Sequence, residues 1–399
     1  SYRMARILPV IALLGIVGLV LNVLIKYVNE EYASVIVHNT NSQTSTESVQ
    51  EEKVDQDKAF DPSQITHVYR LGHQQRYGRF NNQFLTILHA IDRALDEQGD
   101  VPNNRAVVAI ESWASNTLKD LFHDGKNATD FHVMLETLRP AMVVHEDRLD
   151  ALGLTEKKHN KTHIKLSTSE TYFYVNDHKK KLSPSIIKKR RKAFLGALIQ
   201  QRGIAQKNMV LYNALRDHIQ ERKRIFGGGN SSDRDQYVAI HSRWLEGQCE
   251  RRVGDQLPKD ECWMSPSYIK AILGGTIDKP IVLIGDGQNK EVIQNLKKDP
   301  DIGPALIVVA EDIVPDGADI PQPTSDMTIA VMSETFIGTR VSTFATVVGL
   351  LRVTRGADPA TNFIYTRQHE NKESGIEVCE DCLYLCNTTQ SNFCGKEVI

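Results

Sequence analysis

The longest run of apolar residues extends from Ile7 to Ile25, where Asn22 is the one polar residue. A helix of roughly 19 residues can cross a hydrocarbon core of about 30 Å. A cleaved signal peptide is the alternative, but its apolar region would be about 7–15 residues long, and no small-residue cleavage site follows Val28. The pattern therefore predicts that residues 7–28 form an uncleaved transmembrane signal anchor.

The flanking residues predict the orientation of this anchor. Arg3 and Arg6 precede it and only Lys26 follows closely, which favours a cytosolic tail over residues 1–6. Four N-glycosylation sequons lie beyond the anchor, where a glycosylating lumen would meet them. They are at Asn127, Asn160, Asn230 and Asn387. We expect a single-pass type II protein of the Golgi or endoplasmic reticulum membrane, with its bulk in the lumen.

Residues 29–62 contain few large apolar residues. Polar residues dominate the run from Asn39 to Ser48, and mixed acids and lysines follow it. Such a composition cannot offset the entropy of ordering the chain. We expect a disordered stem that holds the next domain away from the membrane.

Strand-like and helical patterns alternate over residues 63–228, which predicts an α/β lobe on the acceptor side. The expected strands are His67–Leu71, Val107–Ile110, Ala141–Val144 and Tyr172–Tyr174. A polar loop, Gly72–Asn82, precedes an expected helix at Gln83–Gln98, and a second helix is expected at Ser185–Gln200. The basic run Lys188–Lys192 is interpreted as a solvated face of that second helix.

The glycine-rich stretch Phe226–Asp233 predicts a linker to a second α/β series over residues 229–368. Its expected strands are Tyr237–His241, Pro280–Ile284, Ala305–Val309, Thr335–Ile337 and Asn362–Tyr365. The helices between them are expected at Ser267–Leu273, Lys290–Lys298 and Phe344–Arg355. Buried parallel strands separated by helices predict a Rossmann-like lobe. Residues 369–399 lose this periodicity and are predicted to form a cysteine-rich tail.

The composition of the chain indicates which classes of partner it can bind and in which compartment it acts. Lys and Arg total 48 and Asp and Glu total 50. No overall charge therefore recruits nucleic acid, and an anionic substrate needs a local cluster. The six cysteines are an even set that fits disulfides in an oxidising compartment, with a zinc knuckle in the tail as the alternative. They are Cys249, Cys262, Cys379, Cys382, Cys386 and Cys394.

Polar residues follow several of the predicted strands, where α/β sheets bind ligands. In Ala239–Arg243, His241 and Arg243 are two residues apart and share one face of a strand, so both could contact a diphosphate. The alternative is an arginine paired with a neighbouring acid. In Gly338–Phe344, hydroxyls and backbone N–H groups open a helix, as in an anion site or a helix cap.

Two further stretches also join a strand to a helix. Tyr77–Gln83, with the sequence Tyr-Gly-Arg-Phe-Asn-Asn-Gln, is open to interpretation as a capped polar loop. Ile284–Lys290 carries two glycines, but Lys290 occupies the position of the third glycine of a dinucleotide motif. We interpret it as a strand-to-helix turn.

Taken in order, these stretches resemble a known family. Gly-Arg-Phe-x-Asn-Gln, then His-x-Arg ending a strand, then an Asp with an apolar helix, Phe-Ile-Gly and Ser-Thr-Phe are similar to the GDP-fucose-dependent protein O-fucosyltransferases and their α1,6- and α1,2-fucosyltransferase relatives. The resemblance extends from about Tyr69 to Arg367. It implies a GT-B fold of two Rossmann-like lobes, with GDP-fucose in the second lobe and no metal or other cofactor.

The resemblance also implies residue roles. Arg243 would neutralise the diphosphate of the leaving group, and His241 would hold the same diphosphate or its ribose. Asp326 would accept hydrogen bonds from guanine. The donor loop would comprise Ser342, Thr343 and Phe344. Asn82 and Arg79 would face fucose and the acceptor from the first lobe, although Asn81 stands where the protein O-fucosyltransferases place glycine.

An acceptor hydroxyl normally needs a base, and Glu246 lies where the α1,6 relatives carry acids. The alternative is a solvated acid paired with a nearby arginine. Cys249 and Cys262 flank the same insertion and could close a disulfide loop. Asp233-Arg-Asp235 has the Asp-x-Asp form of metal-dependent transferases, but it precedes its strand in a linker, so we expect no metal role.

These inferences predict an inverting fucosyltransferase acting on a protein or glycan hydroxyl. Two alternatives stay open. One is a different GT-B nucleotide-sugar transferase. The other is a lectin or chaperone of the secretory pathway that keeps the shape without catalysis.

Overall fold

The computed structural model describes residues 65–76, 79–98, 106–125, 128–138, 141–156, 161–166, 184–225, 236–242, 265–285, 290–314, 322–339, 342–365 and 376–378, all within one compact unit, Asp61–Ile399. The predicted anchor, stem and linker, the asparagines of the sequons and the cysteines lie outside these ranges, as do Tyr172–Tyr174, Asp233, Asp235, Arg243 and Glu246. A search of the described helices finds none with the length and hydropathy of a membrane span.

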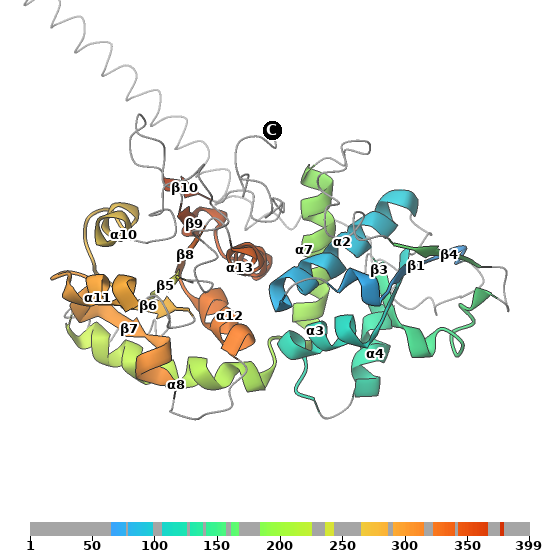
Figure 1. Cartoon of the computed structure of the whole chain (residues 1–399), viewed down its shortest axis with the longest axis horizontal. Coiled ribbons are helices and arrows are strands. Elements are labelled where there is room, and N and C mark those ends of the chain that lie inside the picture. The colour runs from blue at the N-terminus through green and yellow to red at the C-terminus, as the bar shows by residue number, and fades with distance from the viewer. Residues whose placement is uncertain are drawn as a thin grey trace, which may run out of the picture. The chain divides into compact units, whose positions relative to one another are not determined.

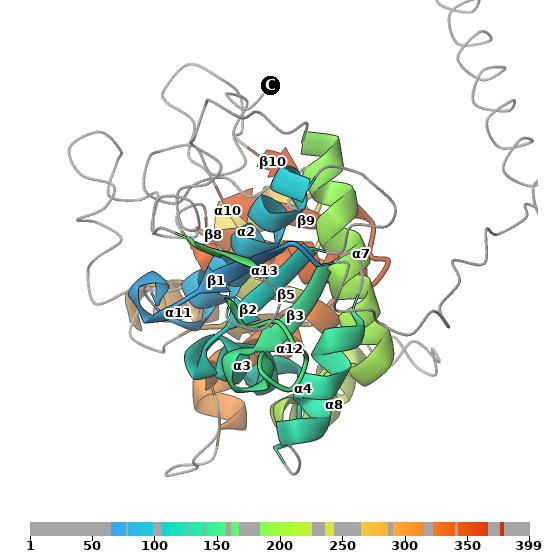
Figure 2. The same cartoon turned by 90° about the vertical axis from the view of Figure 1, so that its right-hand side faces the viewer.

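The first sheet has four parallel strands in the order β3-β2-β1-β4. They are β1 (His67–Leu71), β2 (Ala106–Ile110), β3 (Ala141–His145) and β4 (Thr162–Lys165). Every residue of β2 and β3 is buried, as expected for parallel strands covered on both faces. Strands β1, β2 and β3 lie side by side in Figure 2. The sequence predicted these three strands to within one residue.

Helices connect and cover this sheet. They are α2 (Phe80–Gln98), α3 (Ser112–Phe122), α4 (Ala128–Thr137) and α7 (Pro184–Arg202), with short turns η3 (His73–Gln75) and η4 (Glu146–Arg148). The apolar side of α2 enters the core through Phe84, Ile87, Leu88 and Ile91. Helix α8 (Gln206–Ile225) follows α7 and packs against α12 (Gln322–Met332), a helix of the second sheet (Figure 1).

The second sheet has six strands in the order β10-β9-β8-β5-β6-β7. They are β5 (Val238–His241), β6 (Ile281–Ile284), β7 (Leu306–Val308), β8 (Thr335–Thr339), β9 (Asn362–Tyr365) and β10 (Ile376–Val378). All neighbours are parallel except β10 and β9. From β7 to β9 the order is that of a Rossmann sheet, as the sequence predicted for this part of the chain.

The helices of the second sheet follow its strands. They are α10 (Pro266–Ile272), α11 (Lys290–Lys298), α12 (Gln322–Met332) and α13 (Thr343–Thr354), with η9 (Gly303–Ala305), the π-helical turn η10 (Val309–Ile313) and η11 (Pro359–Thr361). Helix α13 is almost entirely buried and packs against α2 and α7 as well as β8. This contact joins the two motif-bearing helices, α2 and α13.

Several elements differ from the predictions. Helix α2 begins at Phe80 rather than Gln83, so the motif Arg79–Gln83 forms its first turn and not a loop. The prediction missed this turn because it contains two asparagines, and asparagine is a weak helix former. Strand β4 was not predicted because it is a sheet edge without a buried apolar face. Strand β10 lies in the part of the chain that was assigned to the tail.

The basic run at Lys188–Lys192 is not wholly solvated, which corrects the interpretation of one residue in it. Arg191 is buried and donates to Asp92 of α2, with Nε 2.7 Å and an NH2 nitrogen 2.5 Å from Oδ2. A buried arginine needs such a partner because an isolated charge in the interior is costly. The pair fixes α7 against α2.

Asn208 connects the helices around the two sheets. Its side-chain amide donates to the backbone oxygen of Asp120 at the end of α3, and its Oδ1 accepts from Thr324 of α12. The N–O distance of the first bond is 2.7 Å, and the O–O distance of the second is 2.8 Å. Because Asn208 is fully buried, these bonds satisfy a side chain that would otherwise destabilise the fold.

Arg352 holds the carboxyl-terminal half of the second sheet together. From the buried face of α13 it donates to Asn362 Oδ1 (2.7 Å), the backbone oxygen of Glu334 (2.8 Å) and Thr361 Oγ1 (2.8 Å). It also donates to the hydroxyl and the backbone oxygen of Ser333. One guanidinium therefore connects α13 with the turn before β8 and with η11 and β9.

Candidate active site

The strand order of the second sheet places a topological switch point between β5 and β8. The connections from β5 lead to β6 and β7 on one side, whereas β8 and β9 lie on the other. In doubly wound sheets, ligands bind at the carboxyl ends of the strands where this direction reverses. His241 ends β5, and Ser342 precedes α13 just after β8. Two of the stretches selected from the sequence therefore meet at this point.

His241 and Phe344 are in direct contact. Their ring centroids lie 4.3 Å apart and the ring planes differ by 19°, so the rings stack. His241 is 3% exposed, and the stack restricts the imidazole to one plane. The structure thus brings together two residues separated by about a hundred positions that sequence analysis had selected independently.

Ser242 continues the backbone past β5. Its N–H donates to the backbone oxygen of Ile284 at the end of β6, with an N–O distance of 2.9 Å. The Ser242 side chain is buried, and its Oγ has no hydrogen-bond partner in this structure. Arg243 is the next residue and lies outside the described ranges. A rigid strand end therefore precedes the arginine that the sequence assigns to the diphosphate.

Two glycines permit the close packing around this strand end. A Cβ on Gly285 would lie 2.0 Å from the backbone oxygen of Ser242. A Cβ on Gly338 would lie 2.5 Å from the Cβ of Ala345, so only glycine lets β8 approach α13 this closely. Ile284 ends β6 and Lys290 begins α11, so the stretch Ile284–Lys290 connects a strand with a helix, as predicted.

Ser342 occupies the N-cap position of α13 but does not cap the helix with its side chain. Its backbone is extended, and no capping hydrogen bond is made. The side chain is 7% exposed. The sequence predicted either a helix cap or an anion site for this serine, and its side chain makes no capping hydrogen bond. The hydroxyl and the first N–H groups of a 12-residue helix remain as the elements of an anion site.

The remaining sequence-selected residues lie on neighbouring helices. Asp326 is buried on α12, which packs against β5 and α13. On the first turn of α2, Arg79 is exposed and Asn82 is half-buried. The Oδ1 atoms of Asn81 and Asn82 are buried and accept no hydrogen bond in this structure. Helix α2 contacts α13, so both motifs border the same contact between helices.

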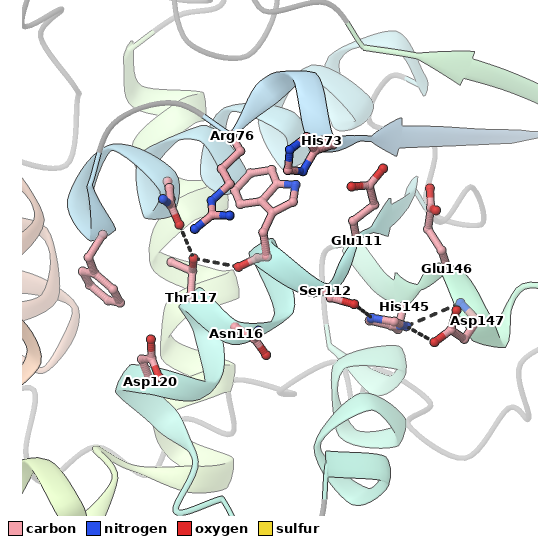
Figure 3. Close-up of a pocket in the computed structure, with 13 residues that line it drawn as sticks. His73, Arg76, Glu111, Ser112, Asn116, Thr117, Asp120, His145, Glu146 and Asp147 are labelled. Carbon is pink, nitrogen blue, oxygen red and sulfur yellow. Dashed lines mark hydrogen bonds and ion pairs between the residues drawn. The ribbon is translucent and has the colours of Figure 1, made fainter. Parts of the chain in front are cut away.

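A second feature, at the carboxyl edge of the first sheet, was not predicted from the sequence. It is a cavity of about 680 Å³ (Figure 3). The lining residues are His73, Arg76, Phe80, Gln83, Glu111, Ser112, Trp113, Asn116, Thr117, Asp120, His145, Glu146 and Asp147. The sequence feature that could have predicted this cavity is the polar residues directly after β2 and β3, because parallel strands end at one edge of a sheet.

Figure 3 shows Ser112, His145 and Asp147 joined in one chain of contacts. Ser112 Oγ lies 3.4 Å from His145 Nε2, and the backbone N–H of Asp147 donates to Nδ1 over 3.4 Å. The order resembles a catalytic triad, but the Asp147 side chain is 87% exposed, whereas a triad acid is buried. The contacts instead present an oriented imidazole and hydroxyl to the cavity.

His132 lies behind this imidazole. The rings of His132 and His145 stack with centroids 4.4 Å apart, and Ser115 Oγ lies 2.7 Å from His132 Nε2. Burial lowers the pKa of His132 to about 4, with further lowering by the charge of Lys119. His132 is therefore neutral near pH 7 and adds no charge to the stacked pair of rings.

This pKa predicts a pH dependence of stability. An unfolded histidine binds a proton near pH 6.5, whereas folded His132 does so only near pH 4. The unfolded state then binds more protons, so the free energy of unfolding should fall as the pH decreases from about 6.5 towards 4. Urea unfolding across this range should show a shallower fall in His132→Gln, which keeps a polar group beside Ser115. An unchanged slope in the variant would assign the pH dependence to other groups.

Among the residues that the structure describes, no three His, Cys, Asp or Glu side chains gather as a bound metal ion would require. The Asp-x-Asp sequence at Asp233 and Asp235 lies outside those ranges.

Comparisons with known proteins give low-level structural similarity. No family model matches the chain, and no curated protein matches its sequence. Among solved structures, a variant of Arabidopsis thaliana FUT1 in complex with GDP is 11% identical, with a TM-score of 0.35 over 77% of this chain and 71% of that one. POFUT1 in complex with GDP-fucose is 13% identical, with a TM-score of 0.37 over 74% of this chain and 96% of that one. The apo form of POFUT1 is 12% identical, with a TM-score of 0.35 over 74% of this chain and 97% of that one.

Proposed function

We propose that this chain is an inverting fucosyltransferase that transfers L-fucose from GDP-fucose to a hydroxyl of a protein or glycan. The observation that carries the proposal is the stacking of His241 and Phe344, next to Ser342, at the topological switch point between β5 and β8. This is the position at which a Rossmann sheet binds a nucleotide. The residues around it follow the order of the fucosyltransferase motifs in the sequence.

The proposed chemistry concentrates on the leaving group. As the bond between fucose and GDP lengthens, negative charge grows on the β-phosphate. Arg243, one residue beyond buried Ser242, would meet this charge with two parallel N–H donors. The hydroxyl of Ser342 and the first N–H groups of α13 would hold the other phosphate oxygens. The acceptor hydroxyl would add from the opposite face of the sugar, which gives an α-fucoside from a β-linked donor.

The first turn of α2 would complete the site. Asn82 and Arg79 lie on a helix that contacts α13, so their side chains can reach towards the sugar from the other sheet. Phe344, with His241 stacked on it, would form an apolar wall. Glu246 is the proposed base for the acceptor hydroxyl, and its failure to act would favour a lectin or chaperone role.

We further propose a setting for this enzyme. Residues 7–28 would anchor it in the Golgi or endoplasmic reticulum membrane, and residues 29–62 would hold the catalytic part in the lumen. The proposed disulfides of the six cysteines fit that oxidising compartment. Transfer would need no metal or other cofactor, because Arg243 and α13 would supply the positive charge.

Nucleotide binding tests the donor assignment. Calorimetry on the full chain should give a lower Kd for GDP than for ADP or UDP, because Asp326 would accept from the N–H groups of guanine. Asp326→Asn changes the shape of this side chain little but removes its charge, and should weaken GDP binding by ~10- to 100-fold with ADP binding unchanged. Equal affinity for the three nucleotides in the unmodified chain would refute the guanine assignment.

A further inference from the structure

The cavity at the carboxyl edge of the first sheet is formed without the second sheet. All of its lining residues belong to β1–β3, α2, α3 and the turns that follow these strands. It is therefore separate from the switch point between β5 and β8. If the donor binds at that switch point, the cavity is available for the other substrate.

We propose that this cavity binds a neutral, hydroxyl-rich sugar unit of the acceptor. The inference rests on the proposed function and extends it, since it names a glycan as the acceptor class. It draws on the charge of the cavity, on the fixed orientation of its polar groups and on its size.

The charge of the cavity disfavours phosphate and other anions. Four of its lining residues carry carboxylates, of which Glu146 is paired with Arg70 at 2.8 Å and Asp120 lies 3.5 Å from Lys207. Asp147 Oδ2 lies 3.4 Å from His145 Nδ1, and Arg76 is the one arginine or lysine among the lining residues. The excess carboxylates of the cavity would repel a nucleoside diphosphate, whereas they would hardly repel a ligand of no net charge.

The polar groups of the cavity are held in position before any ligand binds. Arg70 donates to Glu146 Oε1 through Nε at 3.2 Å and an NH2 nitrogen at 2.8 Å. Thr117 Oγ1 lies 2.9 Å from the backbone oxygen of Trp113 and 3.0 Å from Gln83 Oε1, so it connects α3 with the first turn of α2. Preorganised donors and acceptors bind a ligand with a smaller loss of entropy. Sugar hydroxyls both donate and accept, so they match such a mixture.

The size and shape of the cavity favour a small unit over a folded surface. Its volume of about 680 Å³ lies within the range of about 300–1,000 Å³ found for sites that hold one small molecule. Recognition of a folded protein domain usually uses a face of about 800 Å² per partner. The indole of Trp113 also lines the cavity, with Nε1 anchored to the backbone oxygen of Gly72.

The cavity also adjoins the motif proposed to face fucose. Phe80 and Gln83 line it, and both belong to the first turn of α2, which carries Asn82. A sugar held in the cavity would therefore lie next to the residues that contact the transferred group. This places the acceptor glycan on the first sheet and the donor on the second.

Binding of glycans to the full chain tests the inference. The probes are an array of neutral oligosaccharides, a matched array of phosphorylated oligosaccharides and an array of serine- and threonine-containing peptides. We expect binding to the neutral glycans alone. In calorimetry with the strongest binder, Glu146→Gln and Thr117→Val should each raise the Kd by ~10-fold or more, since each disturbs an oriented polar group. Glu291→Gln, an exposed glutamate on α11, is the matched control and should change nothing.

The outcomes separate this inference from the proposed function. Absence of neutral-glycan binding, preference for peptides, or glycan binding that is insensitive to both cavity variants would overturn the cavity assignment. GDP binding is measured on the same samples and should be unaffected by the cavity variants. Glycan binding without any GDP binding would keep the cavity assignment and overturn the proposed transferase, leaving a lectin.

Discussion

Replacing Arg243 with alanine is expected to slow fucose transfer by ~10²–10³-fold. A preorganised donor to charge that develops in the transition state typically contributes ~3–4 kcal/mol, and Arg243 is proposed to take most of the charge that leaves with GDP. The measurement is kcat/KM for transfer from GDP-fucose. Because the loss occurs in the transition state, kcat should fall more than the affinity for GDP.

Two further measurements sharpen this prediction. Arg243→Lys should rescue little, because one ammonium lacks the planar pair of donors that a diphosphate engages. EDTA should leave the unmodified enzyme active. Near-normal turnover in Arg243→Ala would show that the site is assigned wrongly. Loss of activity with EDTA would instead reopen a metal role for Asp233 and Asp235.

Replacing Arg352 with alanine is expected to destabilise the fold by at least ~3 kcal/mol. The substitution leaves several buried acceptors unpaired, among them Asn362 Oδ1 and the backbone oxygens of Ser333 and Glu334, and each unsatisfied group costs ~1–3 kcal/mol. Burial lowers the pKa of Arg352 to about 10, so the side chain is still protonated at neutral pH and the loss should not depend on pH there. Thermal and urea unfolding measure the change.

Arg355, the C-cap residue of the same helix, is the matched control for Arg352. It is exposed, so Arg355→Ala should change stability little. Arg352→Met, which retains volume but no donors, separates loss of packing from loss of hydrogen bonds. If Arg352→Met is as stable as the unmodified chain, the hydrogen-bond network does not hold α13 to β9, and the prediction fails.

The strands and helices that the sequence predicted are those with a strong apolar pattern. Strand β9 and helix α11 were predicted with their observed bounds, because β9 follows a turn and α11 places Val292, Ile293 and Leu296 on one face. The edge strand β4 and the asparagine-rich first turn of α2 were missed. Their polar residues carry little information on local structure, and tertiary contacts decide it.

The two parts of the candidate site differ in how many of their residues could be predicted from the sequence. His241 and Phe344 could be selected because each follows a recognisable strand, but their stacking needs the fold. The cavity beside Ser112 and His145 has no contiguous motif, since its residues come from three strand ends and two helices. Two of its carboxylates are also paired with Arg70 and Lys207, which no local pattern reveals.

Transfer assays with a set of nucleotide sugars test the central claim most directly. The full chain would be incubated with GDP-fucose, GDP-mannose and UDP-galactose, together with the neutral glycans, and released nucleotide would be measured with each donor. The proposed function predicts release of GDP from GDP-fucose and a new α-linked fucose on the acceptor, with little release from GDP-mannose, which shares the nucleotide. Turnover of another nucleotide sugar with GDP-fucose left intact would contradict it.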